Sequence, residues 1–180
     1  DFRLEARHDR WGPLEGVLGV QTESNRFSAD GEEAFAPYSR TRQAALFVHE
    51  EWSLPWGRLS FGARTERVTV ESMGNPQVDR FVAGGRSFSP RSLALGGLWN
   101  LAPKWQFTAD RWRSERAPRD YELFANGRQV DTAGWELGSA TLDKERSQHL
   151  DVGVQWKSGP DQARIHLFQT RFDNYIALES

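Results

Sequence analysis

The chain has 180 residues, is 38% hydrophobic, carries a formal net charge of −2 and contains no cysteine. These values exclude a disulfide framework and a thiolate metal site, and they give no electrostatic reason to expect a nucleic-acid partner. No run of residues approaches the roughly 18 apolar residues that a membrane helix needs. A transmembrane β-barrel is compatible with the low mean hydropathy of −0.68, because its strands alternate apolar and polar residues.

Segments with an apolar residue at every second position recur along the chain. In the first, Phe2, Leu4 and Ala6 alternate with charged residues. This period of two is typical of strands with one apolar face. The sequence therefore predicts an all-β fold, an antiparallel up-and-down meander of about eight strands. The predicted strands cover residues 2–7, 14–23, 41–52, 59–66, 89–99, 105–110, 147–156 and 163–172.

The connections between these strands alternate between short and long. In a meander, alternate connections lie at the same end of the sheet. All the short connections are therefore expected at one end and all the long ones at the other. Short periplasmic turns and long extracellular loops are typical of bacterial outer-membrane barrels. The short connections are centred near Gly12, Pro55, Pro103 and Pro160, and the long ones near Asp30, Arg80 and Arg128.

Six of the eight tryptophans lie in or beside the short turns. An amphipathic indole prefers the boundary between membrane and water, so this placement favours an aromatic girdle at one end of a barrel. The alternative is that these side chains pack the floor of a soluble β-sandwich. The six are Trp11, Trp52, Trp56, Trp99, Trp105 and Trp156.

The stretch 114–156 holds the longest connection, of roughly 30 residues, far above the usual hairpin length of about 2–5. Charged residues surround Pro118, among them Glu115 and Arg116, and we expect this segment to lie outside any central strand. Asn126-Gly127 is predicted to form a turn, because both residues tolerate positive φ. A loop of this length is usually functional or disordered.

This stretch resembles the C-terminal part of the barrel of TonB-dependent outer-membrane receptors. The resemblance implies a segment of a large barrel of about 22 strands, filled by an N-terminal plug, in the outer membrane of a Gram-negative bacterium. It also implies that extracellular loops capture a scarce nutrient, which enters with energy relayed by the TonB complex. The motifs are E-R-A-P at 115–118, Y-E-L-F-A-N-G at 121–127, W-E-L-G at 135–138, L-D-K-E-R-S at 142–147 and F-D-N-Y-I at 172–176.

The chain begins without Met or a signal peptide, inside or beside a strand. We therefore expect residues 1–180 to be a partial receptor barrel, with the plug domain, the TonB-contacting segment and the closing strand elsewhere. A segment of this kind has two unpaired edges and an exposed apolar face, so self-association through the sheet edges is expected.

The long loops supply the candidate ligand-binding residues. Clustered carboxylates suit a hard cation or a basic ligand, and arginines suit an anionic chelate or the phosphates of outer-membrane lipid. The segment F-S-A-D-G-E-E-A-F at 27–35 is also similar to a loop in the zinc-uptake branch of the family. A metal ion, a ferric siderophore, haem, cobalamin and a sugar are all compatible ligands, with the first three favoured, and plain solvation is the alternative role for these charges. The candidates are Asp30, Glu32, Glu33, Arg80, Arg86, Arg119, Asp120, Glu122 and Arg128.

Catalytic and cofactor motifs are absent from the sequence, so we expect neither an enzyme nor a bound cofactor. Four histidines fall on predicted strands without ligand spacing, and only His49, beside Glu50 and Glu51, is a candidate metal ligand. Two other functions are compatible with the strand pattern. One is a soluble β-sandwich or small barrel that binds carbohydrate or protein through its loops, and the other is an outer-membrane barrel enzyme.

Overall fold

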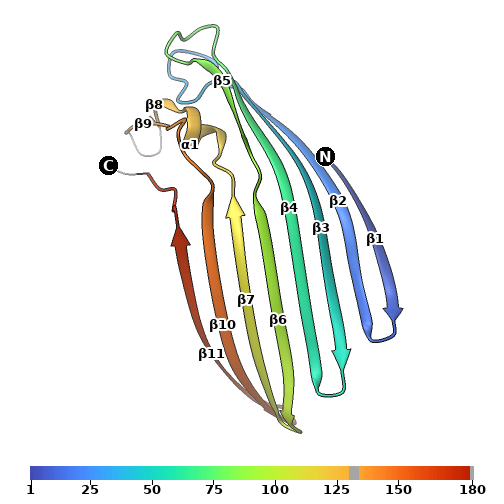
Figure 1. Cartoon of the computed structure of the whole chain (residues 1–180). Coiled ribbons are helices and arrows are strands. Elements are labelled where there is room, and N and C mark those ends of the chain that lie inside the picture. The colour runs from blue at the N-terminus through green and yellow to red at the C-terminus, as the bar shows by residue number, and fades with distance from the viewer. Residues whose placement is uncertain (130–133, 179–180) are drawn as a thin grey trace.

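Figure 1 shows the computed structural model, which describes residues 1–129 and 134–178. The long strands form one antiparallel meander in the order β1-β2-β3-β4-β6-β7-β10-β11. The alternation of apolar and polar residues thus predicted both the all-β class and the eight long strands correctly. These strands are β1 (Phe2–Trp11), β2 (Leu14–Phe27), β3 (Ser39–Leu54), β4 (Gly57–Met73), β6 (Arg91–Ala102), β7 (Trp105–Arg116), β10 (Glu145–Ser158) and β11 (Asp161–Asp173).

Four shorter elements lie at the loop end of the sheet. The strand β5 (Ala83–Phe88) pairs with β4, and β8 (Asn126–Arg128) pairs with β9 (Trp135–Leu137) in a separate two-stranded sheet. The helix α1 (Asp120–Phe124) has five residues. Among the residues that the structure describes, no helix is long and apolar enough to cross a membrane.

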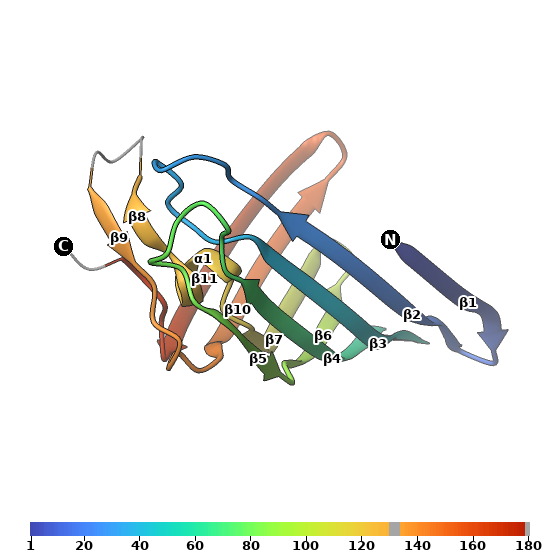
Figure 2. The same ribbon diagram turned by 90° about the horizontal axis from the view of Figure 1, so that it is seen from above.

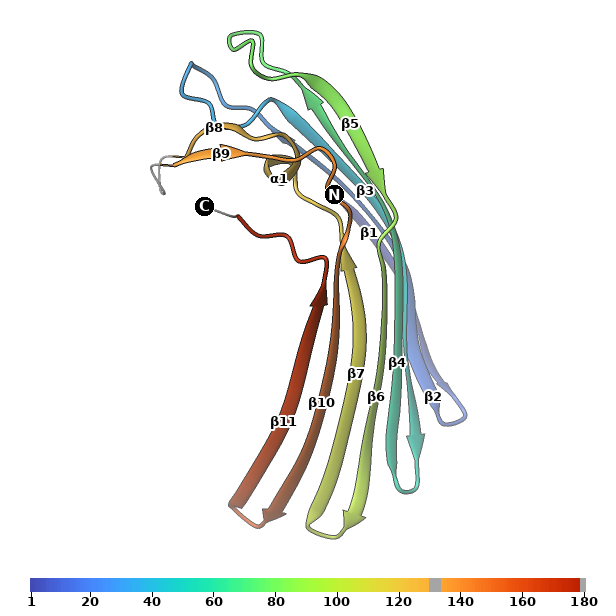
Figure 3. The same cartoon turned by 60° about the vertical axis from the view of Figure 1, so that its left-hand side comes forward.

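The sheet is open and curved (Figure 3). Over the described residues, β1 pairs with β2 alone and β11 with β10 alone, so the two outermost strands do not meet. The antiparallel meander is what the sequence predicted, whereas the sequence left open whether the sheet closes into a small barrel. Self-association through these edges stays a prediction.

The pairing register separates the sheet into two faces. Leu4, Val20 and Leu46 are direct cross-strand partners, and Leu4 and Leu46 are 60% and 58% exposed. This side is the apolar face. The opposite side, the polar face, carries charged residues such as Arg64, and α1 packs against it through Leu123. A single-layer sheet with one apolar and one polar face is typical of the wall of a transmembrane barrel.

The buried apolar side chains gather near the loops rather than along the sheet. Val68, Val70 and Phe88 of β4 and β5 enclose Leu123, which is 2% exposed. A second cluster joins Ala34, Val78 and Phe81, from the loops that follow β2 and β4. The two clusters sit beneath and between the loops, so burial of apolar area there holds the loops against the sheet.

The tryptophan placement predicted from the sequence is confirmed. The six indoles lie in the short turns or close to the strand ends that those turns join. Trp56 and Trp99 stack with ring centroids 6.0 Å apart, and Trp99 also contacts Phe107 at 5.5 Å. The short-turn end therefore carries a band of aromatic rings.

Two local predictions near Pro118 were wrong. Glu115 and Arg116 belong to the central strand β7, and they pair with Arg146 and Glu145 of β10. Proline removes its own N–H and restricts the residue before it, so a proline two residues beyond a strand end leaves that strand intact. The pair Asn126-Gly127 is not a turn but part of the extended strand β8.

The predicted loop between residues 73 and 87 was also partly wrong. Gly84 and Gly85 pair with Ser72 and Glu71 as part of β5, and β6 begins at Arg91 rather than at Ser89. The strand β5 pairs through its backbone groups. Its sequence, A-G-G-R-S-F, has no alternation of apolar and polar residues from which a strand could be predicted. Pro90 interrupts the ladder between β5 and β6, because it has no N–H to donate.

Candidate ligand-binding site at the loop end

Three long connections converge at one end of the sheet. They are the segment 28–38 between β2 and β3, the segment 74–82 between β4 and β5, and the part of 117–144 around α1, β8 and β9 that the structure describes. Figure 2 looks onto this end, where the β8–β9 hairpin lies beside the first two loops. Loops that far apart in sequence need specific contacts to hold a common shape.

Arg80 provides the main contact among the three loops. Its Nε donates a hydrogen bond of 2.5 Å to the carbonyl oxygen of Asn126, and its Nη2 donates to the carbonyl oxygens of Glu32 at 3.0 Å and Ala34 at 2.5 Å. The guanidinium also lies 5.5 Å from the centroid of the Trp135 ring. The planar group has donors pointing in several fixed directions, so a single side chain ties three chain segments together.

The backbones of the first and third loops meet at Gly127. The Asn126 N–H donates to the Phe35 carbonyl at 2.9 Å. A Cβ on Gly127 would lie 2.5 Å from Phe35 Cα and 2.7 Å from the Ala34 oxygen. Glycine is required here because another backbone approaches closely, not because a turn needs positive φ.

Two of the predicted carboxylates are occupied by structural partners around α1. Asp120 accepts a hydrogen bond from Ser39 Oγ. Glu122 accepts from the Arg119 N–H at 2.7 Å and from Arg116 Nη1 at 2.8 Å. The first bond satisfies an N–H at the start of the helix that has no partner within the helix. Both carboxylates therefore position α1.

Other predicted residues also hold the loops. Arg86 donates to the carbonyl oxygens of Ala140 and Leu142, the latter at 3.3 Å, and so fastens the segment before β10 to β5. Tyr38 donates to Asp30, and this hydrogen bond raises the pKa of the phenol above its ordinary value of 10.0. Arg119 is exposed and donates to the Tyr121 hydroxyl at 3.0 Å.

A cavity of about 790 Å³ opens between the three loops. Four predicted ligand residues line it: Glu32, Glu33, Arg80 and Arg128. Its wall also contains Asp79 and Trp135, which the sequence reasoning missed. Asp79 is adjacent to a predicted residue, and Trp135 is one of the two tryptophans away from the short turns, so both had a signal that could have drawn attention.

The carboxylates of this cavity are not committed to the protein. Within the described residues, the side chains of Glu32, Glu33 and Asp79 make no hydrogen bond or ion pair that would occupy them, and the same is true of Arg128. Free carboxylate oxygens can coordinate a hard cation or accept from a polar ligand, and a free guanidinium can bind an anionic group. The exposed ring of Trp135, 63% accessible, offers a flat apolar surface beside them.

His49 lies away from this site, in the half of β3 nearer the short turns, on the polar face. Its Nε2 is 3.7 Å from Glu51 Oε1, and the imidazole is 52% exposed. In the part of the chain that the structure describes, no three or more His, Cys, Asp or Glu residues come together as a metal-binding group. His49 as a metal ligand stays a prediction.

A second cavity, of about 830 Å³, lies below α1 on the polar face. Its wall includes Arg64, Glu66 and Ser39, together with Arg119 and Asp120 from the third loop. Six of the nine predicted residues thus line one of the two cavities, four among the loops and two against the sheet. Asp30, Arg86 and Glu122 line neither.

A family model described as "TonB dependent receptor-like, beta-barrel" matches residues 1–180. The chain belongs to this family. The family is one of receptors rather than enzymes, and it places the chain in the cell outer membrane. The single-layer sheet agrees with this assignment and not with a soluble sandwich of two packed sheets.

The chain is similar to the iron-regulated outer membrane virulence protein of Vibrio cholerae serotype O1 (strain ATCC 39541 / Classical Ogawa 395 / O395), with 27% identity over 168 residues. The match covers 90% of this chain and 23% of that protein, so the chain spans about a quarter of the relative's length.

Two solved structures share the fold. The hemophore receptor HasR of Serratia marcescens, a double mutant in complex with its hemophore HasA and heme, superposes with a TM-score of 0.75 at 16% identity, over 96% of this chain and 32% of that one. The copper transporter OprC gives a TM-score of 0.74 at 21% identity, over 96% and 30%.

Proposed function

We propose that this chain is a barrel segment of a TonB-energised receptor that imports a scarce metal-containing nutrient, and that the cavity among the loops contacts this nutrient. The observation that carries the proposal is a set of carboxylates and the guanidinium of Arg128, all without a partner among the described residues, around one cavity at the long-loop end. Long loops of outer-membrane barrels face the extracellular side, where a nutrient arrives.

The ligand class follows from the chemistry of the cavity and from the relatives. Glu32, Glu33 and Asp79 suit a metal ion or a donor-rich chelate, and Trp135 suits a flat ring system such as haem. The relatives are named as a receptor in complex with a hemophore and heme, a copper transporter and an iron-regulated protein. A metal ion, a ferric siderophore or haem is therefore the proposed cargo.

The proposed partners are those of a complete receptor. A plug domain and an N-terminal TonB-contacting segment outside residues 1–180 would couple the barrel to the TonB complex, and membrane lipid would cover the apolar face. The match to 23% of the relative's length supports a larger parent protein. Without the remaining strands, the edges β1 and β11 would recruit further copies of the chain.

The test uses the complete receptor, produced in cells that lack other receptors of this family, with and without functional TonB. Haemin, ferric citrate, Cu²⁺ and Zn²⁺ are supplied one at a time, and cellular accumulation is measured. We expect one probe to accumulate only when TonB is functional. Replacing Glu32→Gln together with Glu33→Gln should raise the concentration for half-maximal uptake about tenfold, since losing a contact worth roughly 1.4 kcal/mol has that effect.

The matched control removes the same charge from the other end of the sheet, through Glu15→Gln with Asp161→Asn. Both carboxylates are exposed at the short-turn end, and uptake should not change. If no probe accumulates in a TonB-dependent manner, the proposed function is wrong. If uptake is TonB-dependent but the loop variant matches the parent, the cavity is not the ligand contact.

A further inference from the structure

A second group of charges lies at the loop end, on the apolar face of the sheet. Residues in the loop-side half of β6, β7, β10 and β11 supply it, together with Lys144 just before β10, and the register aligns Arg113 with Leu93 and Arg111 with Leu95. On β11, Arg171 is opposite Gln148, which is itself opposite Arg113. We call this group the cationic rim; it comprises Arg91, Arg111, Arg113, Lys144, Arg146 and Arg171.

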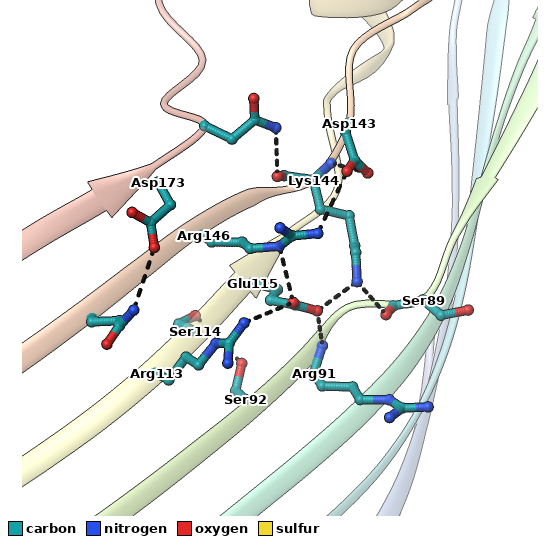
Figure 4. Close-up of polar contacts among 12 residues, drawn as sticks. Ser89, Arg91, Ser92, Arg113, Ser114, Glu115, Asp143, Lys144, Arg146 and Asp173 are labelled. Carbon is teal, nitrogen blue, oxygen red and sulfur yellow. Dashed lines mark hydrogen bonds and ion pairs between the residues drawn. The ribbon is translucent and has the colours of Figure 1, made fainter.

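One carboxylate, Glu115, lies at the centre of the rim (Figure 4). Its oxygens are 2.6 Å from Lys144 Nζ, 3.3 Å from Arg146 Nε and 3.9 Å from Arg113 Nη2. Only 10% of the Glu115 side chain is exposed. A single buried carboxylate thus holds three cations together without neutralising them.

The charge of the rim stays positive when its other acidic neighbours are included. Asp143 lies 3.5 Å from Arg146, and Asp173 lies 3.4 Å from Arg171. Six cations therefore face three carboxylates, in a chain whose formal net charge is −2. Positive charge is concentrated at this edge against the balance of the whole molecule.

Two members of the rim have no partner at all in the described part of the chain. The side chains of Arg91 and Arg111 are exposed and make neither a hydrogen bond nor an ion pair there. Figure 4 shows the guanidinium of Arg91 extending away from Glu115, although the Arg91 backbone N–H donates to that carboxylate at 3.0 Å. No contact in the described part of the chain gives these two exposed guanidinium groups a structural role. On an otherwise apolar face, they are therefore available to an anionic partner.

The rim lies at one boundary of the apolar band. Level with Arg113 and Arg111 on the same face are Leu93 and Leu95, and Leu167 lies nearer the short turns; these leucines are 55%, 59% and 70% exposed. On these four strands, all of whose residues the structure describes, the other end of the apolar face carries Trp99, Trp105 and Trp156 and no lysine or arginine. Arginine on a lipid-facing surface is costly at the bilayer midplane and tolerated at the interface. The rim therefore marks the interface on the long-loop side.

We propose that the cationic rim binds the phosphate groups of an anionic glycolipid in the membrane leaflet on the loop side. Guanidinium forks match phosphate oxygens in pairs, and cations near an anionic lipid surface are attracted to it. The leucines beside and below the rim would contact the acyl chains of the lipid, which a free phosphate ion lacks. The proposal depends on the outer-membrane location and not on the ligand cavity, so either can fail without the other.

The test measures lipid retention by the complete receptor in mild detergent, with native mass spectrometry as the readout. The probes are diphosphoryl lipid A and the same lipid after removal of its phosphates. The variant Arg91→Gln, Arg111→Gln, Arg113→Gln removes three neighbouring charges. We expect the parent to retain the phosphorylated lipid preferentially and the variant to bind it about 100-fold more weakly, from roughly fivefold per cation.

The matched control removes three cations from the short-turn end, through Arg58→Gln, Lys104→Gln and Lys157→Gln, and should retain the lipid as the parent does. Equal retention of the dephosphorylated lipid, equal loss in the control, or displacement by equimolar inorganic phosphate would overturn the proposal. Circular dichroism checks that the strands are formed. If the triple variant does not fold, the single variants Arg91→Gln and Arg111→Gln, whose side chains have no structural partner, should each lose roughly fivefold, and unchanged binding in both would equally overturn it.

Discussion

The two ends of this sheet are stabilised in different ways. At the short-turn end, neighbouring strands reverse direction within a few residues, and aromatic rings such as Trp56 and Trp99 stack over the strand ends. At the loop end, segments more than 40 residues apart are joined by side chains that donate to backbone carbonyl oxygens, as Arg80 does. The first end depends on local chain geometry, and the second depends on long-range contacts.

This difference between the two ends separates the stability of the sheet from the specificity of its binding surface. Short turns and ladder hydrogen bonds use backbone groups, so we expect the short-turn end to tolerate substitution of its exposed side chains better than the loop end does. The loop end must pay the conformational entropy of long segments, and a few contacts offset it. Among the residues that the structure describes, those contacts leave the side chains of Glu32, Glu33, Asp79 and Arg128 without a partner around a cavity. A binding surface is thus built from residues that the supporting contacts do not use.

Leu123→Ala should produce the largest break in the comparison. Leu123 is 2% exposed between Val68, Val70 and Phe88, and truncation of a buried leucine costs about 2–5 kcal/mol. We expect α1 to leave the polar face and amide hydrogen exchange of residues 120–128 to become at least roughly 30-fold faster, while the short-turn end keeps its protection.

The control for this variant is Leu95→Ala on the apolar face, where the parent side chain is 59% exposed. Exchange at the loops should not change. If Leu123→Ala leaves α1 as protected as in the parent, then the small core under the loops does not hold them.

Arg80→Lys should have the next largest effect. Lysine keeps the charge but has one nitrogen, so it cannot reach the carbonyls of Asn126, Glu32 and Ala34 together. We expect a loss of about 2–3 kcal/mol in the docking of the loops, read as faster exchange in 28–38 and 126–128. Arg128→Lys is the matched control, because Arg128 makes no such bonds in the described residues, and its exchange pattern should equal that of the parent.

The sequence predicted the strands well because the strand signal is local. Alternation such as Phe2, Leu4 and Ala6 is set by lipid or water on each side of one strand, and no distant partner is needed. The loop architecture was not predictable in this way. The dipeptide Asn-Gly suits both a turn and a position where another backbone approaches closely. Only the presence of Phe35, about 90 residues earlier, decides between these two for Asn126-Gly127.

The same reasoning explains what was predicted of the site. Charged loop residues are visible in a sequence, so Glu32, Glu33, Arg80 and Arg128 can be predicted as candidates without knowing that the loops converge. Whether a charge is free or engaged depends on carbonyls and hydroxyls from other loops, which leave no pattern. The sequence for that reason did not distinguish Asp120, which accepts from Ser39, from the unengaged Glu32.

Tyr38 offers the smallest and most local test. Its hydrogen bond to Asp30 raises the pKa of the phenol above 10.0, because an ionised phenolate could not donate to the carboxylate. The contact is complete below the ordinary pKa, and its contribution is lost as the pH rises through the raised value. A titration of phenolate absorbance should therefore show a component above pH 10 that is missing in Tyr38→Phe. If the component missing in Tyr38→Phe titrates at the ordinary pKa of 10.0 in the parent, the first loop is held by its contacts to Asn126 and Arg80 and not by its own hydroxyl–carboxylate pair.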